Sequence, residues 1–416
     1  MLTDRVQTHA DERPRHSADA SARLNGLECA LLSHEARYRT GNLSVGAMGR
    51  VEGRPPTLED FREALRPGLR ARSRLRLAVS TEDTGSWRHV AELDVHGHVR
   101  QWVCPTGTEL RTAVEQIMSA RLRTDRPLWE VWLIRGYSRD EWAVVFKAHH
   151  ALLDGASVVQ VLAELFDTGG DVHIPAQRGK HHLPEEEPPR QVRGSLRRLG
   201  RYFPLARRAF TCAEGSGERR FHWAQVDRSR LERAAARHGV SVDDVFLAAL
   251  TTAVREWRHT PWDRGTPRPV WTLFGNRIAP PRVQLPCHDP DPVRRLDTIA
   301  KATQGIGDEP VSSEASSPWL ATRAVATSFS TRHAALIASA VHGPEWEPGF
   351  HGARMRELVP LGPLPVGHWL GAYLVTHADR AGVGFVLDPS VRNGAELCRL
   401  WSLAFAELDG PLERLC

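Results

Sequence analysis

Apolar residues recur along the first third of the chain with two different spacings, and these predict helices and strands in turn. Helical spacing predicts amphipathic helices over residues 57–66 and 110–120. Two apolar stretches, 129–134 and 142–148, flank a polar turn and predict a β-hairpin. The second of these strands ends at a pair of histidines. A further helix is expected directly afterwards, because the apolar positions between 158 and 166 again fall on one face.

The same patterns resume in the second half of the chain. Strands are predicted over 221–226, 270–274, 335–341, 371–375 and 382–387, and helices over 229–238, 242–257 and 397–408. Between the halves the composition shifts to glycine, proline, an acidic run and many arginines, which predicts a linker with one basic helix over 192–210. We therefore expect a polar tail (1–22), an N-terminal lobe (23–166), a linker (167–217) and a C-terminal lobe (218–416).

Composition narrows the class of protein. The 416 residues are 41% hydrophobic and 25% charged, which is typical of a globular protein and excludes a disordered or collagen-like chain. Six cysteines without a Cys-x-x-Cys pair predict reduced thiols rather than a disulfide scaffold or a zinc ribbon. The net charge of +5 is carried by 52 arginines and three lysines spread along the chain, so nucleic-acid binding is not expected.

The sequence also bears on localisation. Residues 1–21 lack the apolar core of a signal peptide, and prolines interrupt the most apolar segment, 358–378, which we therefore predict to form strands and turns. A cytoplasmic protein is expected. The segment Arg190–Arg208 holds seven arginines and no acid, and it could contact an anionic membrane surface, lipid or an acidic carrier protein. A solvated linker helix is the alternative reading of that segment.

The sharpest chemical feature is the segment His149-His150-Ala151-Leu152-Leu153-Asp154-Gly155. A histidine with a near-neutral pKa can remove a proton from an alcohol or an amine. An aspartate four residues later can hold the turn by pairing with an arginine, and the glycine permits a tight turn. Two surface histidines beside a helix cap are the alternative. No metal site is expected, because the other histidine pair, His181-His182, lacks further ligands at suitable spacing.

These residues match the His-His-x-x-x-Asp-Gly motif of the condensation-domain and chloramphenicol-acetyltransferase-like superfamily. The earlier segment Pro127-Leu128-Trp129-Glu130 resembles the Pro-Leu-Trp-Glu segment of the bacterial wax ester synthase/diacylglycerol acyltransferase family. Four further segments resemble motifs of that family in the same order: Leu24–Glu28, Ser241–Val245, Phe274–Arg277 and Val341–Pro344. The resemblance spans residues 24–408.

The resemblance implies an α/β fold of two chloramphenicol-acetyltransferase-like lobes, a pseudo-dimer of mixed sheets with a tunnel between them. It implies that His150 is the general base in direct acyl transfer from a coenzyme A or acyl-carrier-protein thioester to a hydroxyl, without a cofactor. The acceptor would be a long-chain alcohol, a diacylglycerol or a specialised-metabolite alcohol. His149, Asp154 and Gly155 would complete the catalytic motif. The implied substrate-binding residues are Pro127, Leu128, Trp129, Asp243, Asp244, Asn276 and His342.

The sequence departs from the family pattern at three places. Asp243 replaces an asparagine, and Ala340-Val341-His342 replaces Asn-Val-Pro. The Pro-Val-Ser-Leu-Arg segment expected before Phe274 is missing, and with it the arginine expected to pair with Asp154. Two alternatives therefore stay open: an amide-forming condensation enzyme, and a binding protein that kept the fold without catalysis.

Overall fold

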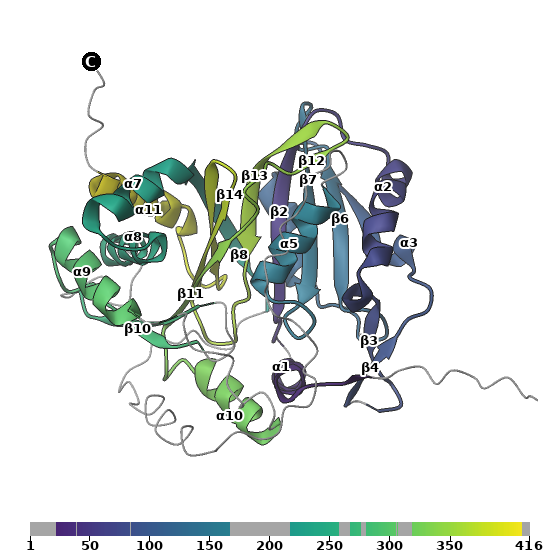
Figure 1. Cartoon of the computed structure of the whole chain (residues 1–416), viewed down its shortest axis with the longest axis horizontal. Coiled ribbons are helices and arrows are strands. Elements are labelled where there is room, and N and C mark those ends of the chain that lie inside the picture. Colours follow the sequence, from purple (N-terminus) through teal and green to yellow (C-terminus); the bar gives the residue numbers. More distant parts are fainter. Residues whose placement is uncertain are drawn as a thin grey trace, which may run out of the picture.

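Two six-stranded mixed β-sheets stand side by side in the computed structural model, with most of the helices on their outer faces (Figure 1) and α4 (Leu110–Ser119) packed between them. The structure describes residues 22–38, 40–83, 85–166, 217–257, 267–275, 280–304, 306 and 318–409. The predicted tail, apart from Ala22, and residues 167–216 of the predicted linker, with the basic segment Arg190–Arg208, lie outside these ranges. The expected two-lobed α/β architecture is confirmed.

The first sheet has the strand order β12-β13-β2-β7-β6-β5. Its strands are β2 (Ser44–Glu52), β5 (Val99–Val103), β6 (Trp129–Arg135), β7 (Glu141–His149), β12 (Gly349–Phe350) and β13 (Ala353–Leu361). The predicted hairpin is confirmed, because β6 and β7 pair antiparallel with Trp129 opposite Ala148. On its other side β7 pairs with β2, where His149 lies opposite Ser44. The strand that ends at the histidines is therefore central in its sheet.

Both faces of β7 are covered, which explains its nearly continuous apolar sequence. Successive side chains of a strand point to opposite faces. Val144 and Phe146 join the core under the helices of one face, whereas Ala143 and Val145 join the core between the two sheets. The helices of the first lobe are α1 (Gly26–Arg37), α2 (Leu58–Ala71), α3 (Val95–His98), α4 (Leu110–Ser119) and α5 (Gly155–Leu165), with a 3-10 turn η1 (Ser73–Arg76). Helix α2 starts after Thr57, as predicted, but continues through Pro67.

The second sheet has the order β10-β9-β11-β14-β15-β8. Its strands are β8 (Arg220–Asp227), β9 (Val270–Phe274), β10 (Arg282–Leu285), β11 (Leu336–His342), β14 (Leu370–His377) and β15 (Arg380–Leu387). Its helices are α7 (Arg228–His238), α8 (Val242–Glu256), α9 (Pro292–Thr303), α10 (Pro318–Ser328) and α11 (Gly394–Asp409). A small third sheet joins β1 (Ala22–Arg23), β4 (Ser86–His89) and β3 (Leu77–Val79). The predicted elements of this half are confirmed close to their predicted bounds.

Within the predicted C-terminal lobe, the chain crosses back to the first sheet. Strand β13 pairs antiparallel with β2 along the edge of the first sheet, with Leu361 opposite Gly46. The backbone of β13 also lies against β15: a Cβ added at Gly382 or Gly384 would lie 2.2 or 2.1 Å from a carbonyl oxygen of β13. Residues 218–416 are therefore not one separate lobe.

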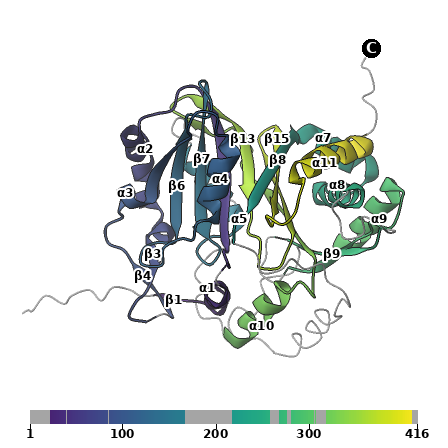
Figure 2. The same ribbon diagram turned by 180° about the vertical axis from the view of Figure 1, so that it is seen from behind.

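The two lobes also meet below the sheets, where α1 of the first packs on α10 of the second (Figures 1 and 2). Ala151, in the turn after the histidine pair, belongs to the same apolar cluster as Leu31 of α1 and Val325 of α10. The segment 358–378 forms parts of β13 and β14, as predicted. Among the helices of the described residues, none is both long and apolar enough to cross a membrane.

Candidate active site

The histidine pair lies at the end of β7, where backbone hydrogen bonds hold the chain. The N–H of His149 donates to the carbonyl of Leu128 at 2.9 Å, and the N–H of His150 donates to the carbonyl of Leu43 at 3.0 Å. The N–H of Leu152 donates back to the carbonyl of His149 at 2.9 Å. The turn is therefore closed on itself and tied to two neighbouring segments. It presents His150 between a strand end and a helix start, as the sequence predicted.

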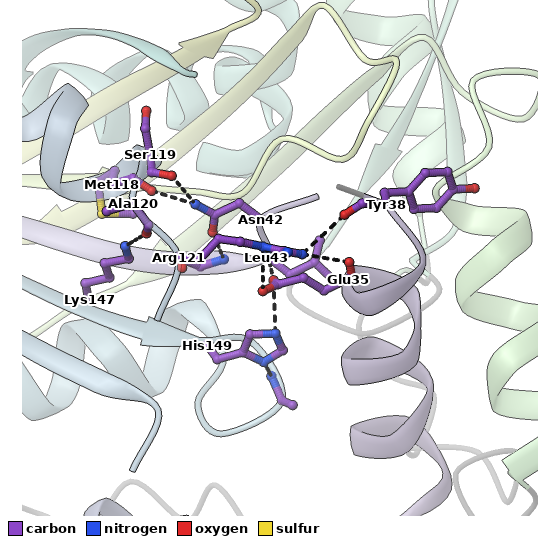
Figure 3. Close-up of polar contacts among 12 residues, drawn as sticks. Glu35, Tyr38, Asn42, Leu43, Met118, Ser119, Ala120, Arg121, Lys147 and His149 are labelled. Atoms are coloured by element: carbon purple, nitrogen blue, oxygen red, sulfur yellow. Dashed lines mark hydrogen bonds and ion pairs between the residues drawn. The ribbon is translucent and has the colours of Figure 1, made fainter. Parts of the chain in front are cut away.

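The ring of His149 is buried, and both of its nitrogens are occupied (Figure 3). Its Nε2 lies 3.1 Å from Oε2 of Glu35, and its Nδ1 accepts the backbone N–H of Ala151 at 3.0 Å. Because Nδ1 accepts, the ring proton lies on Nε2 and is donated to the Glu35 carboxylate. The structure thus gives His149 a positioning role, with no ring nitrogen left to act on a substrate.

Glu35 ties α1 to both histidines. Its Oε2 also accepts the N–H of Leu43 at 2.6 Å, and the carbonyl of Leu43 accepts the N–H of His150. Its Oε1 lies 3.6 Å from Nε of Arg121. Burial alone would raise the pKa of Glu35, but the hydrogen bonds from His149 and from the Leu43 N–H, together with the charge of Arg121, hold that pKa below its usual value. An ionised carboxylate therefore anchors the start of β2 and the first histidine together.

Sequence reasoning missed Glu35, because it predicted no helix before residue 57. A signal was present in Asn25 and Glu28. Oδ1 of Asn25 accepts the N–H of Glu28 at 2.9 Å, and Oε2 of Glu28 accepts the N–H of Asn25 at 2.9 Å. This capping box is typical of a helix start. This capping box begins α1, and Glu35 lies about two turns beyond Glu28 on the same helix.

The ring of His150 differs from that of its neighbour. Its Nδ1 is buried and has no hydrogen-bond partner in another described residue. Burial lowers the pKa of His150 below its usual value, although its own backbone carbonyl and the carboxylate of Asp154 oppose this effect. The imidazole is therefore neutral near pH 7, the state in which a histidine can accept a proton.

Asp154 caps α5. Its Oδ1 accepts the N–H of Ser157 at 2.7 Å, which satisfies one of the free N–H groups of the first helical turn. The expected ion pair with an arginine is not found among the described residues. Gly155 begins α5 without a positive φ, and a Cβ there would make an ordinary contact 3.8 Å from Cγ2 of Val341. We expected the glycine to permit a tight turn, but the backbone at Gly155 has no conformation that requires glycine.

Pro127, Leu128 and Trp129 were predicted to bind substrate, but the structure buries their side chains in the first lobe. The ring of Trp129 stacks on His98 with centroids 4.3 Å apart, and its Nε1 donates to a backbone carbonyl at 2.7 Å. The carbonyl of Leu128 holds the N–H of His149. This segment therefore sets the position of the histidine pair from within the core.

The second lobe contributes Asp243 and His342. Oδ1 of Asp243 is buried without a hydrogen-bond partner among the described residues and lies 3.8 Å from Nε2 of His342, whose side chain is largely exposed. Burial raises the pKa of Asp243, Asp244 adds to the effect, and His342 opposes it. Asp244 instead forms a capping box with Ser241, whose N–H it accepts at 2.9 Å, and it accepts the hydroxyl of Thr303. Asp244 thus has a structural role at the start of α8.

Helix α5 brings this second-lobe pair towards the histidine turn. Val341 is the nearest neighbour of a Cβ added at Gly155, and His342 follows Val341 at the end of β11. The first lobe therefore places His150 at the interface between the lobes, and the second lobe places Asp243 and His342 there. Asn276 lies outside the described residues. Within those residues, no three His, Cys, Asp or Glu side chains come together in a way that could hold a metal ion.

A buried lysine fixes α4 beside the histidine strand (Figure 3). Nζ of Lys147 donates to the carbonyls of Ile117 and Ala120 at the end of α4, the first at 2.8 Å. Nδ2 of Asn42 donates to the carbonyl of Met118 at 2.8 Å. Burial lowers the pKa of Lys147 to about 8, although nearby carboxylates oppose the effect. A cation at a helix C-terminus is favourable. Lys147, two residues before His149 on β7, therefore holds the end of α4 beside the histidine strand.

Comparison with known proteins agrees with this architecture. Residues 24–204 match the model of the wax ester synthase/diacylglycerol acyltransferase catalytic domain, and residues 274–409 match the C-terminal domain of the same family. A protein of Mycobacterium tuberculosis named "Probable diacyglycerol O-acyltransferase tgs1" is 26% identical over 428 residues, which cover 88% of this chain and 91% of that protein.

Two solved structures share the fold. The wax ester synthase/diacylglycerol acyltransferase of Marinobacter aquaeolei VT8 has a TM-score of 0.69 at 19% identity, covering 93% of this chain and 99% of that one. The first condensation domain of the CDA synthetase has a TM-score of 0.56 at 16% identity, covering 94% and 96%. The chain therefore belongs to the wax ester synthase/diacylglycerol acyltransferase family and is an O-acyltransferase.

Proposed function

We propose that this enzyme transfers an acyl group from a coenzyme A or acyl-carrier-protein thioester to a hydroxyl, with His150 as the general base. The observation that carries the proposal is the state of the His150 ring. Backbone hydrogen bonds hold the turn that carries the ring, its Nδ1 has no hydrogen-bond partner in another described residue, and its lowered pKa keeps it neutral. A neutral, pre-positioned imidazole is suited to proton removal.

The two ring nitrogens of His150 are not equivalent. Nδ1 is buried without a hydrogen-bond partner among the described residues, so a substrate hydroxyl does not reach it. We therefore assign the lone pair that takes the proton to Nε2. In the proposed reaction Nε2 removes the acceptor's hydroxyl proton while the oxygen attacks the thioester carbonyl, giving a tetrahedral oxyanion. Its collapse forms the ester and expels the thiolate, which takes the proton back from the imidazolium.

This mechanism needs neither a covalent acyl-enzyme nor a cofactor. Both substrates would meet in a tunnel between the lobes. Much of the entropy lost in bringing them together would then be lost on binding and would not add to the barrier of the chemical step. The acceptor is proposed to be a long-chain alcohol, a diacylglycerol or a specialised-metabolite alcohol. The names of the relatives support the first two. The pair Asp243 and His342, with its unsatisfied carboxylate oxygen, is proposed to contact the acceptor.

The test is the turnover of His150→Ala with acyl-CoA and alcohol. We expect a loss of about 10²–10⁴-fold, the usual contribution of a general base, with the thermal unfolding curve unchanged. His96→Ala, at an exposed histidine of the same lobe, is the matched control and should retain turnover. Near wild-type turnover in His150→Ala would overturn the proposal.

A second measurement separates direct transfer from a covalent route. Incubation with acyl-CoA alone should leave the intact mass of the protein unchanged, and addition of an alcohol should then release ester. A stable mass increase would contradict the role of His150 as a simple base. Products formed only from matched amines would favour amide formation instead.

A further inference from the structure

A recess of about 320 Å³ lies where α4 of the first lobe meets β8 and α11 of the second. Figure 2 shows these three elements beside one another on the back of the molecule. Its polar wall holds Arg111 of α4 with Arg220 and His222 of β8, and none of its described lining residues is acidic. The mechanism proposed above uses none of these side chains.

Both arginines line the recess, and each pairs with one carboxylate. Nη2 of Arg111 donates to Glu109, whose side chain is 70% exposed, and Nη1 of Arg220 donates to the nearly buried Glu115. Each guanidinium has five N–H donors in a planar fork, so these contacts leave others unused. Burial and the charges of the two arginines lower the pKa of His222 to about 4, so its ring is neutral at pH 7. The positive charge of this wall therefore comes from the arginines.

The rest of the lining combines apolar side chains with a helix start. Leu387 and Val391 line it, and residues 393–395 bring in the first turn of α11. A Cβ added at Gly394 would lie 2.6 Å from the ring of His222, so glycine is required for this close approach. A helix N-terminus carries free N–H groups and a partial positive charge. Two guanidinium groups, a helix start and an apolar patch thus face one space.

We propose that this recess binds the phosphate-bearing nucleotide end of the coenzyme A donor. The phosphates would bind between Arg111, Arg220 and the start of α11, and the base would pack on the apolar wall. Arginine forks suit phosphate because they can make two parallel charge-assisted hydrogen bonds. The proposal rests on the proposed acyl transfer and adds to it a donor site that spans both lobes.

Helix α4 connects the recess to the histidine turn. Arg111 lies at its beginning, and Lys147, two residues before His149, holds the carbonyls at its end. Ten residues of helix span about 15 Å. The recess is thus about one helix length from the strand end that carries the base, a separation that the extended pantetheine arm of coenzyme A can cover.

The experiment measures binding of free coenzyme A by calorimetry, which needs no turnover. Ala395→Glu places a carboxylate in the recess, at a helix start where acidic residues are favourable, so it should fold normally. Ala395→Gln is its neutral counterpart. We expect Ala395→Glu to weaken coenzyme A binding roughly tenfold to a hundredfold relative to Ala395→Gln, and Arg111→Gln to weaken it by a similar factor. Arg399→Gln, on α11 but outside the recess, should leave binding unchanged.

Three further ligands distinguish the outcomes. A short acyl-cysteamine thioester lacks the nucleotide, so its turnover should be equal in wild type and Ala395→Glu. If that thioester and acyl-CoA both fail with wild type, the proposed acyl transfer fails while the binding measurement still stands. Equal coenzyme A affinity in Ala395→Glu and Ala395→Gln would overturn the site. Inorganic phosphate that binds as tightly as coenzyme A would overturn the assignment to a nucleotide.

Discussion

Replacing Glu35 by glutamine tests whether a carboxylate on α1 positions the catalytic turn. Oε2 of Glu35 accepts two hydrogen bonds, from Nε2 of His149 at 3.1 Å and from the N–H of Leu43 at 2.6 Å. A glutamine keeps the shape of the side chain, and its amide oxygen can take the place of Oε2 and accept both bonds, but without the negative charge. Its NH₂ group then lies towards Arg121, where it can accept nothing. A hydrogen bond to a charged group contributes about 1.5–3 kcal/mol and a neutral one about 0.5–1.5 kcal/mol, so we expect the free energy of unfolding to fall by about 1.5–3 kcal/mol for the two bonds together.

The effect on catalysis should be separable from the effect on stability. Glu35 acts through His149 and Leu43, so its loss should misplace His150 without removing a substrate contact. We expect kcat to fall about tenfold to a hundredfold, which corresponds to about 1.4–2.7 kcal/mol in the barrier, while KM for acyl-CoA stays unchanged. Steady-state turnover at 25 °C and urea unfolding measure the two quantities. Glu59→Gln, at a largely exposed carboxylate of α2, is the matched control.

The pH dependence gives a third readout for Glu35. Its pKa is lower in the folded protein than in the unfolded chain, so its stabilising contribution is fully present above the unfolded pKa of about 4.3. That contribution is lost as the pH falls through the folded pKa. The stability difference between wild type and Glu35→Gln should therefore shrink below about pH 4. A variant with wild-type kcat would refute the positioning role, even if its stability had dropped.

His150, Asp154 and the glycines of β15 each give a further test. Because burial lowers the pKa of His150, kcat/KM should stay on its plateau until the pH falls below about 6.5, and an acid limb centred above that value would contradict the lowered pKa. Asp154→Ala should cost about 1 kcal/mol in urea unfolding, the value of a helix cap; a loss of about 3–5 kcal/mol would instead indicate a buried ion pair. Gly384→Ala should destabilise by about 2 kcal/mol or more, because its Cβ would lie 2.1 Å from the carbonyl oxygen of Pro360, whereas Gly155→Ala should lose far less.

Periodicity predicted the elements around the site because their apolar faces are regular. The hairpin of β6 and β7 and the helix after Asp154 were found from local pattern alone. The return of β13 to the first sheet could not be predicted in this way. It depends on a free sheet edge at β2 and on close backbone approach at Gly382 and Gly384, which are properties of the assembled chain. No local spacing reports such a long-range pairing.

The candidate site likewise has one part that the sequence predicted and one part that it did not. The motif identified the turn that carries His150, but not the residues that hold it. Glu35 is 114 positions before His149, and their contact exists only because α1 packs beneath the sheet. Leu128 and Trp129, which the family resemblance implied as substrate contacts, are buried in the core. A recurring sequence pattern can therefore record the demands of packing as readily as those of chemistry.

This division bears on whether an intact motif indicates catalysis. His149 uses both ring nitrogens to hold the turn, and Asp154 caps α5. A protein that only kept the fold would need both residues for the same structural reasons. His150 is different, because its buried Nδ1 makes no hydrogen bond with another described residue and burial penalises its charged form. An apolar residue of similar size would satisfy the fold at least as well. The presence of His150, rather than of the whole motif, is therefore the feature that a purely structural protein does not explain.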